Sequence, residues 1–185
     1  MREELEELKK QCKDGVSYIE AVKKLESDSI KIEAVAEMKS EYSKALIINS
    51  LKSDENKIKA INLLKNDLEK TIVIEGIKSD EIKIQMLDEL QSEEIKSYVI
   101  ERFINDDNYK IEGLNKLSND YYIASVIISL SSDENRINKI EEIDLLNKVE
   151  EYTKTRIIRS FNSDEIKMKM IDLLKFDSLK CDVIE

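Results

Sequence analysis

The sequence predicts an all-α protein, a right-handed α-solenoid of about seven short helical hairpins with a 26-residue period. Six isoleucines recur at intervals of 26, 26, 27, 31 and 26 residues, each inside a similar local sequence. Proline is absent, only three glycines occur, and charged residues make up 38% of the 185-residue chain. A period of this length is typical of stacked units that cannot bury their apolar faces alone. The isoleucines are Ile48, Ile74, Ile100, Ile127, Ile158 and Ile184.

Each unit is predicted to begin with a helix that follows a capping residue. Ser or Asp at this position accepts hydrogen bonds from the first backbone N–H groups of a helix. Apolar residues follow the cap by five, eight and eleven positions, as Ile58, Ile61 and Leu64 follow Ser53. This spacing places them on one side of a helix. The caps are Ser27, Ser53, Ser79, Asp106, Ser132 and Ser163.

A second helix is predicted thirteen residues after each cap, where Ser or Asn occurs again in four units and an acidic residue follows it. It carries a small residue, then a β-branched residue, then the recurrent isoleucine, as in Thr71, Val73 and Ile74. The wider apolar face indicates that the second helix of each unit is the more buried one. The second caps are Ser40, Asn66, Ser92 and Asn119.

Charges also recur with the period, although the net charge is −10. A basic residue lies three positions after an acidic one in every first helix, as Lys57 follows Asp54. We expect these charges to pair at the surface, within a helix and between units. The alternative is a lysine track for nucleic-acid phosphates, but the acidic neighbours and the lack of a stacking ladder of aromatic residues argue against it. The basic residues are Lys31, Lys57, Lys83, Lys110, Arg136 and Lys167, with Lys44, Lys70, Lys96, Lys154 and Lys180 on the second helices.

Residues 1–185 are expected to form a single solenoid domain, with an N-terminal capping hairpin over 1–26 and repeats over 27–185. The unit from Ser132 is five residues too long, with the excess near 144–153. We expect a lengthened helix that packs Leu145, Leu146 and Val149 onto its neighbour. Should these side chains be exposed, the insertion becomes an interaction site, because insertions into solenoids map to one face.

The last hairpin lacks a polar cap, since the sequence stops before the final apolar position is reached. Self-association, a docking partner and further sequence beyond Glu185 each explain this. We expect a homodimer or a partner contact through Leu179, Val183 and Ile184.

The paired helices with an acid-then-base ladder, as in SDENKIKAINLL and SDENRINKIEEI, resemble HEAT-like α-solenoids over nearly all of residues 27–185. The unit is shorter than those repeats and lacks their proline and aromatic signatures. Its basic residue also precedes the branched apolar one, which reverses the usual HEAT order. Because HEAT-like proteins are mostly scaffolds that grip other proteins, the resemblance implies binding without naming a ligand.

Composition removes several function classes. Histidine is absent and no C-x-x-C pair occurs, which argues against zinc sites and most nucleophile–histidine systems. Paired-carboxylate catalysis is disfavoured because the carboxylates recur at helix caps in every unit. We therefore expect no enzymatic activity, no cofactor and no metal. No run is long enough to span a membrane and no signal peptide is evident, so a cytoplasmic protein is expected.

The outward positions of the second helices vary more than the apolar columns, which is typical of a recognition face. Tyrosine and arginine near the middle of the chain are the residue types that dominate protein interfaces. We expect an adaptor or inhibitor that binds another protein. The alternative is an acidic mimic of nucleic acid that blocks a nucleic-acid-binding enzyme, as phage anti-defence proteins do. The expected contact residues are Ile72, Tyr98, Arg102, Tyr121, Tyr122, Ile128, Arg156 and Arg159.

Overall fold

The computed structural model describes residues 2–184 of the chain and the side chains of residues 3–183. Within this range every secondary-structure element is helical, which confirms the all-α prediction. The chain divides into two compact units, Met1–Ile95 (unit 1) and Lys96–Glu185 (unit 2). None of the described helices combines the length and apolar character needed to cross a membrane.

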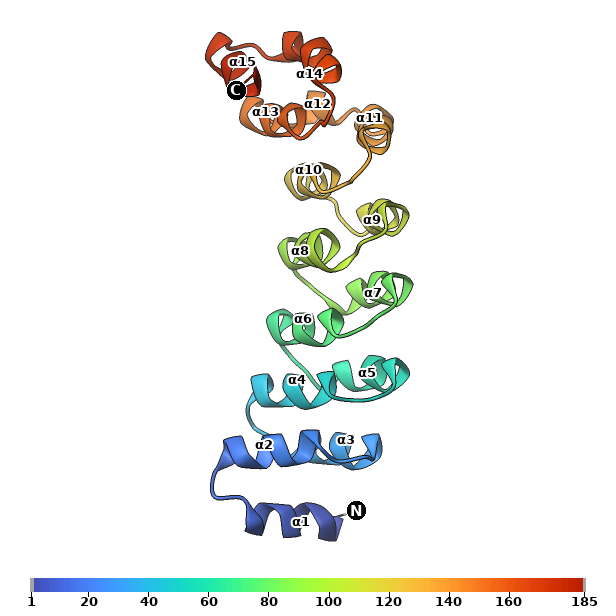
Figure 1. The fold of residues 1–185 in the computed structure, drawn as a ribbon, viewed down its shortest axis with the longest axis vertical. Helices are drawn as coiled ribbons and strands as arrows, with labels where there is room; N and C mark the ends of the chain where they lie inside the picture. Colours follow the sequence, from blue (N-terminus) through green and yellow to red (C-terminus); the bar gives the residue numbers. More distant parts are fainter. Residues whose placement is uncertain (1, 185) are drawn as a thin grey trace. The chain divides into compact units, whose positions relative to one another are not determined.

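Unit 1 contains short helices that alternate between two stacked rows (Figure 1). Helices α2, α4 and α6 lie in one row, where α2 packs against α4 and α4 against α6, and α3, α5 and α7 lie in the other. The helices are α1 (Arg2–Gln11), α2 (Gly15–Lys23), α3 (Asp28–Glu37), α4 (Glu41–Asn49), α5 (Asp54–Ile61), α6 (Asp67–Glu75) and α7 (Asp80–Met86), which continues as the 3-10 helix η1 (Leu87–Glu89).

Unit 2 begins within α8 (Glu93–Phe103) and repeats the alternation. Helix α10 packs against α9, α11 and α13, and α13 packs against α15. The remaining helices are α9 (Asp107–Leu114), α10 (Asp120–Ile128), α11 (Asp133–Glu142), α12 (Leu145–Lys148), α13 (Glu151–Arg159), α14 (Asp164–Met170), the 3-10 helix η2 (Ile171–Leu173) and α15 (Asp177–Ile184).

The predicted capping residues precede the helices as expected. Ser53, for example, accepts a hydrogen bond from the backbone N–H of Asn56, and Asn119 accepts one from Tyr121. The core confirms that the second helices are the more buried. The recurrent isoleucines are 0% exposed at all described positions, and so are the residues before them except Val183 (5%). These are Ile47, Ile48, Val73, Ile74, Val99, Ile100, Val126, Ile127, Ile157 and Ile158; Ile184 lies outside the described side chains.

The prediction is wrong at one kind of core position. The apolar residue five places after the first cap is only half-buried at Ile58 and Ile111, and Met168 is 56% exposed. At Lys57 and Lys110 the basic residue one position earlier is buried instead.

Five of the six basic residues of the first helices are buried, with Lys31, Lys57, Lys83, Lys110 and Arg136 between 2% and 8% exposed, and Lys167 is half-buried. The predicted pairing with the acidic residue three positions earlier forms at four of the six, as in Lys57–Asp54 (3.3 Å) and Lys83–Asp80 (3.0 Å). Three of the lysines donate through Nζ to a backbone carbonyl 19 residues later, at 2.8 Å: Lys31 to Ser50, Lys57 to Gly76, and Lys110 to Ser129. Each acceptor is the residue that ends a second helix, where carbonyls lack intrahelical partners. Burial lowers the pKa of Lys31. These side chains therefore do not form an exposed track for phosphates.

Acidic residues at the start of the first helices bind the loop that follows each hairpin. Asp28 accepts from the backbone N–H groups of Lys52 (3.0 Å) and Ser53 (3.2 Å), and Asp107 accepts from those of Ser131 and Ser132. Burial opposes ionisation of Asp28 and Asp107, but these hydrogen bonds outweigh it and hold the pKa of both carboxyls below the ordinary value. The separation in sequence is 24 or 25 residues.

Acidic residues at the start of three second helices make the same kind of bond. Glu41 accepts from the backbone N–H of Lys65 (2.8 Å), Asp67 from Gln91 (2.8 Å), and Glu151 from Lys175 (3.0 Å), each 24 residues later. We call the lysine–carbonyl and carboxylate–N–H bonds together the polar ladder. Each of these bonds gives a partner to a backbone carbonyl at the end of a helix or to a backbone N–H group in a loop.

Candidate binding surface

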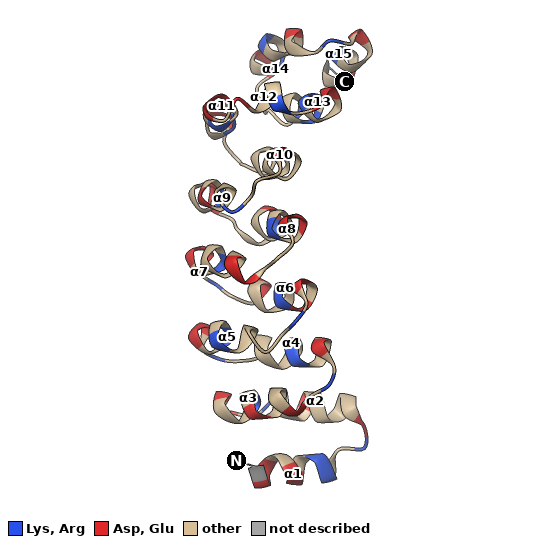
Figure 2. Ribbon diagram, turned by 180° about the vertical axis from the view of Figure 1, so that it is seen from behind, with Lys and Arg blue, Asp and Glu red and all other residues tan. Residues whose placement is uncertain are grey.

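The second helices of unit 2 expose aromatic residues, and one of these helices, α10, carries little charge. Helix α10 contains one charged residue, Asp120, and stands out in Figure 2 because lysine, arginine and acidic residues are interleaved on most other helices. Tyr121 on α10 is 51% exposed and Tyr152 on α13 is 68% exposed. Because exposed tyrosines on packed helices present rigid apolar area, this face is suited to a protein contact.

Tyr121 is held by two neighbours. Its ring lies 5.5 Å from that of Tyr122 in an edge-to-face arrangement. The guanidinium carbon of Arg156, on α13, lies 5.8 Å from the centroid of the Tyr121 ring, within the range of a cation–π contact. The structure thus brings Tyr121, Tyr122 and Arg156 together as one cluster.

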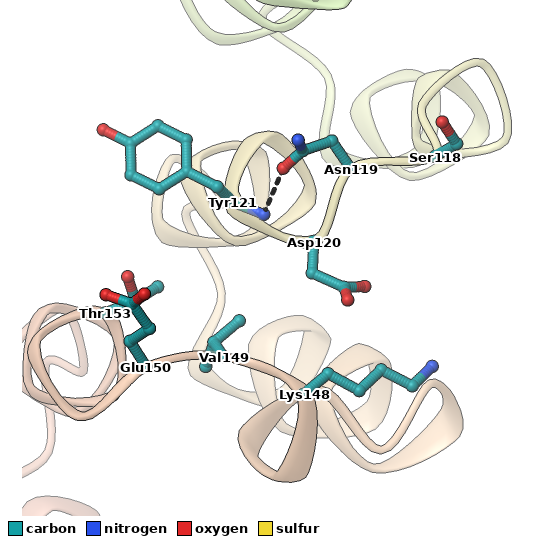
Figure 3. A pocket seen from close by; sticks show the side chains of 8 residues that line it. All are labelled: Ser118, Asn119, Asp120, Tyr121, Lys148, Val149, Glu150 and Thr153. Atoms are coloured by element: carbon teal, nitrogen blue, oxygen red, sulfur yellow. Dashed lines mark hydrogen bonds between the residues drawn. The ribbon is translucent and has the colours of Figure 1, made fainter.

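A hollow of about 440 Å³ lies beside this cluster, between the start of α10 and the segment that joins α12 to α13 (Figure 3). Asp120 points from α10 toward α12, while Glu150 and Thr153 lie at the start of α13. The lining residues are Ser118, Asn119, Asp120, Tyr121, Lys148, Val149, Glu150 and Thr153.

The insertion shapes the lower side of this hollow. Asp144 adopts the left-handed backbone conformation (φ 51°, ψ 42°) and separates α11 from the four-residue helix α12. The expected lengthened helix is therefore wrong. Leu145 is fully buried, and Leu146 and Val149 are half-buried, so the insertion is anchored by its first leucine and does not present an exposed apolar stripe.

The other predicted contact residues are dispersed. Tyr98 is exposed and its ring packs edge-to-face on Phe103 of the same helix, at 5.4 Å. Arg102 and Arg159 are exposed, Ile128 is half-buried, and Ile72 is a half-buried residue of unit 1.

Sequence reasoning missed Tyr152, Asp120, Glu150 and Thr153. Tyr152 follows Tyr121 by the same 31 residues that separate Ile158 from Ile127, so the repeat register contained the signal for it. The three polar residues gave no such signal, because they lie in the first turn of a helix or directly before it, where polar residues are common. They differ from the equivalent residues of the other hairpins only because the insertion shifts the segment that follows α11.

The C-terminal hairpin holds two of the three residues expected in an oligomer contact inside its own core. Val183 is 5% exposed and clusters with Ile158, Ile171 and Leu174, and Leu179 packs against this cluster. Ile184 lies outside the described side chains. The exposed apolar side chains of this hairpin are Met168, Leu173 and Phe176.

Across the described residues, no group of three or more cysteine or acidic side chains is placed to hold a metal ion. No protein-family model matches the chain. Searches of curated proteins and of solved structures likewise gave no significant match.

Proposed function

We propose that the chain is a right-handed α-solenoid of about seven hairpins that acts in the cytoplasm as a non-enzymatic adaptor or inhibitor of another protein. The recurrence of the polar ladder supports the repeat. Bonds that span 19, 24 or 25 residues return in successive hairpins, as expected when each hairpin meets its neighbour in the same way.

The binding role rests on one observation, the exposed tyrosines of α10 and α13. Tyr121 and Tyr152 are exposed there while the residues beneath them, such as Ile127 and Ile158, are fully buried. A partner can cover exposed side chains without a change in backbone conformation when the helices that carry them are well packed. Tyr121 and Tyr152 meet this condition.

Affinity capture from native lysate, followed by mass spectrometry, tests the proposal. The wild-type chain should enrich a specific protein, and the double substitution Tyr121→Ala with Arg156→Ala should reduce its recovery at least about tenfold, as hot-spot truncations do. Tyr98→Ala with Arg102→Ala tests the α8 residues in the same way.

The control is Glu55→Ala with Lys59→Ala, an exposed pair on α5. It should leave recovery unchanged. Equal recovery with all three double variants would remove this face as the binding surface.

A second function, mimicry of nucleic acid, is favoured by the burial of the ladder lysines. The net charge is −10, and burial of these basic side chains leaves fewer exposed ammonium groups among the surface carboxylates. In that case the captured protein would be a nucleic-acid-binding enzyme, and duplex DNA would displace it. A partner that resists competition by DNA favours the adaptor role.

A further inference from the structure

The insertion leaves Asp120 without the role of its counterparts. Asp120 is the first residue of α10, as Glu41 is of α4 and Asp67 of α6. Those residues accept a backbone N–H 24 residues later. For Asp120 that position is Asp144, whose N–H instead donates to the carbonyl of Glu141.

The five-residue shift caused by the insertion does not bring another backbone N–H to Asp120. Five residues further on, the N–H of Val149 donates to the carbonyl of Leu145. Within the described part of the chain, the Asp120 side chain has no hydrogen bond or ion pair, although it points into the hollow between α10 and α12 (Figure 3). The insertion has converted a structural carboxylate into an unused one.

Thr153 supplies a second, independent sign of a ligand. It is 7% exposed and lines the same hollow. Thr71 and Thr155 are buried as well, but they donate to the carbonyl four residues earlier, at 2.8 Å and 2.9 Å. The Thr153 hydroxyl makes no such bond within the described chain. A threonine that is nine-tenths buried, lines a hollow and makes no hydrogen bond within the described chain keeps its hydroxyl available for what enters the hollow.

The charges of the hollow determine which chemistry fits. Asp120 and Glu150 contribute two carboxylates, neither paired with a described basic group, and Lys148 contributes one ammonium. The ring of Tyr121 forms part of the wall. Two carboxylates, a hydroxyl acceptor and an aromatic edge match a guanidinium, which is planar, carries five N–H donors and stacks on aromatic rings.

We propose that this hollow seats an arginine side chain of the protein partner. This inference rests on the proposed protein-binding function and specifies the chemistry of the bound side chain. A volume of about 440 Å³ accommodates an arginine side chain with its adjoining backbone. Asp120 and Glu150 receive the guanidinium, and the Thr153 hydroxyl accepts one of its N–H groups.

The test is an NMR titration of the full-length ¹⁵N-labelled chain with Nα-acetyl-arginine amide. Saturable shifts should appear at residues 118–121 and 148–153. The neutral citrulline analogue should bind at least about tenfold more weakly, because it lacks the charge. The lysine analogue should also bind more weakly, since an ammonium cannot bridge both carboxylates. Equal shifts with citrulline, or shifts spread over other acidic sites, would overturn the proposal.

Variants locate the site. Asp120→Asn and Glu150→Gln should each weaken arginine binding about tenfold, Thr153→Val should weaken it less, and Lys148→Ala should strengthen it. The matched control, Glu165→Gln, changes an exposed acid on α14 and should have no effect. If Asp120→Asn perturbs the spectrum as a whole, Glu150→Gln, at an exposed side chain, decides the question.

Capture from lysate separates this inference from the proposed function. If wild-type chain and Asp120→Asn recover the same partner equally and arginine causes no shifts, the arginine site is wrong and the adaptor role stands. If arginine binds in the hollow but no protein is captured, the site stands and the adaptor role is wrong.

Discussion

The polar ladder and the hollow beside α10 use the same residue types in opposite ways. In the ladder, carboxylates such as that of Asp28 accept hydrogen bonds from loop N–H groups, and ammonium groups such as that of Lys57 donate to carbonyls at helix ends. In the hollow, Asp120, Glu150 and Lys148 have no described partner. The charges of the ladder thus stabilise the fold, whereas Asp120, which lost its partner 24 residues later through the insertion, is available for binding.

The largest expected effect is on the free energy of unfolding, through the buried core of the helices. Ile100→Ala should cost about 2–5 kcal/mol in the free energy of unfolding, because a fully buried side chain leaves a cavity. Ile111→Ala, at a half-buried position, should cost clearly less. Urea denaturation of both variants measures the difference. Equal losses would mean that first and second helices contribute alike.

Removing one lysine from the ladder should cost less than a core cavity and more than any surface charge. Lys57→Met keeps the apolar stem but loses the bond to the Gly76 carbonyl (2.8 Å) and the ion pair with Asp54 (3.3 Å). We expect a loss of about 2 kcal/mol. Lys59→Met, at an exposed side chain two residues away, should change stability by less than about 0.5 kcal/mol. A similar effect for both would place Lys57 at the surface.

Acid should weaken the ladder through its carboxylates. The pKa of Asp107 is lowered in the folded chain, so its stabilisation is complete at neutral pH. It declines as pH falls below about 4, the ordinary value for aspartate, and is lost once pH drops below the folded-state value. Thermal unfolding between pH 7 and pH 3 should show a shallower decline for Asp107→Asn than for wild type. Parallel curves would contradict this.

The smallest effect separates two threonines on one helix. Thr155→Val removes the bond to the Glu151 carbonyl and should cost about 1 kcal/mol. Thr153→Val removes a hydroxyl without a described partner and should leave the melting temperature unchanged or raise it. Calorimetry of the two variants provides the comparison. A loss at Thr153 equal to that at Thr155 would show that its hydroxyl already serves the fold.

The helices and their buried residues could be predicted from the sequence because helix caps and branched apolar residues are local signals. Ser53 and Ile74 are examples, since each follows from spacing alone. The inward position of Lys57 could not be predicted, because a long aliphatic stem packs like an apolar residue while its ammonium reaches a distant carbonyl. The unpaired state of Asp120 could not be predicted either. It differs from Asp67 only because the loop 24 residues later follows another path and does not offer its backbone N–H.

The separation in sequence of the ladder bonds has a consequence for how such a chain tolerates added residues. Several bonds span 19, 24 or 25 residues, but Asp133 reaches across the insertion to the backbone N–H groups of Asn162 and Ser163, 29 and 30 residues later. An added segment can therefore loop out and leave a tether intact, as it does beyond Asp133, or remove the partner of a tether, as it does at Asp120. Changes of length inside the chain are thus a source of unoccupied polar groups.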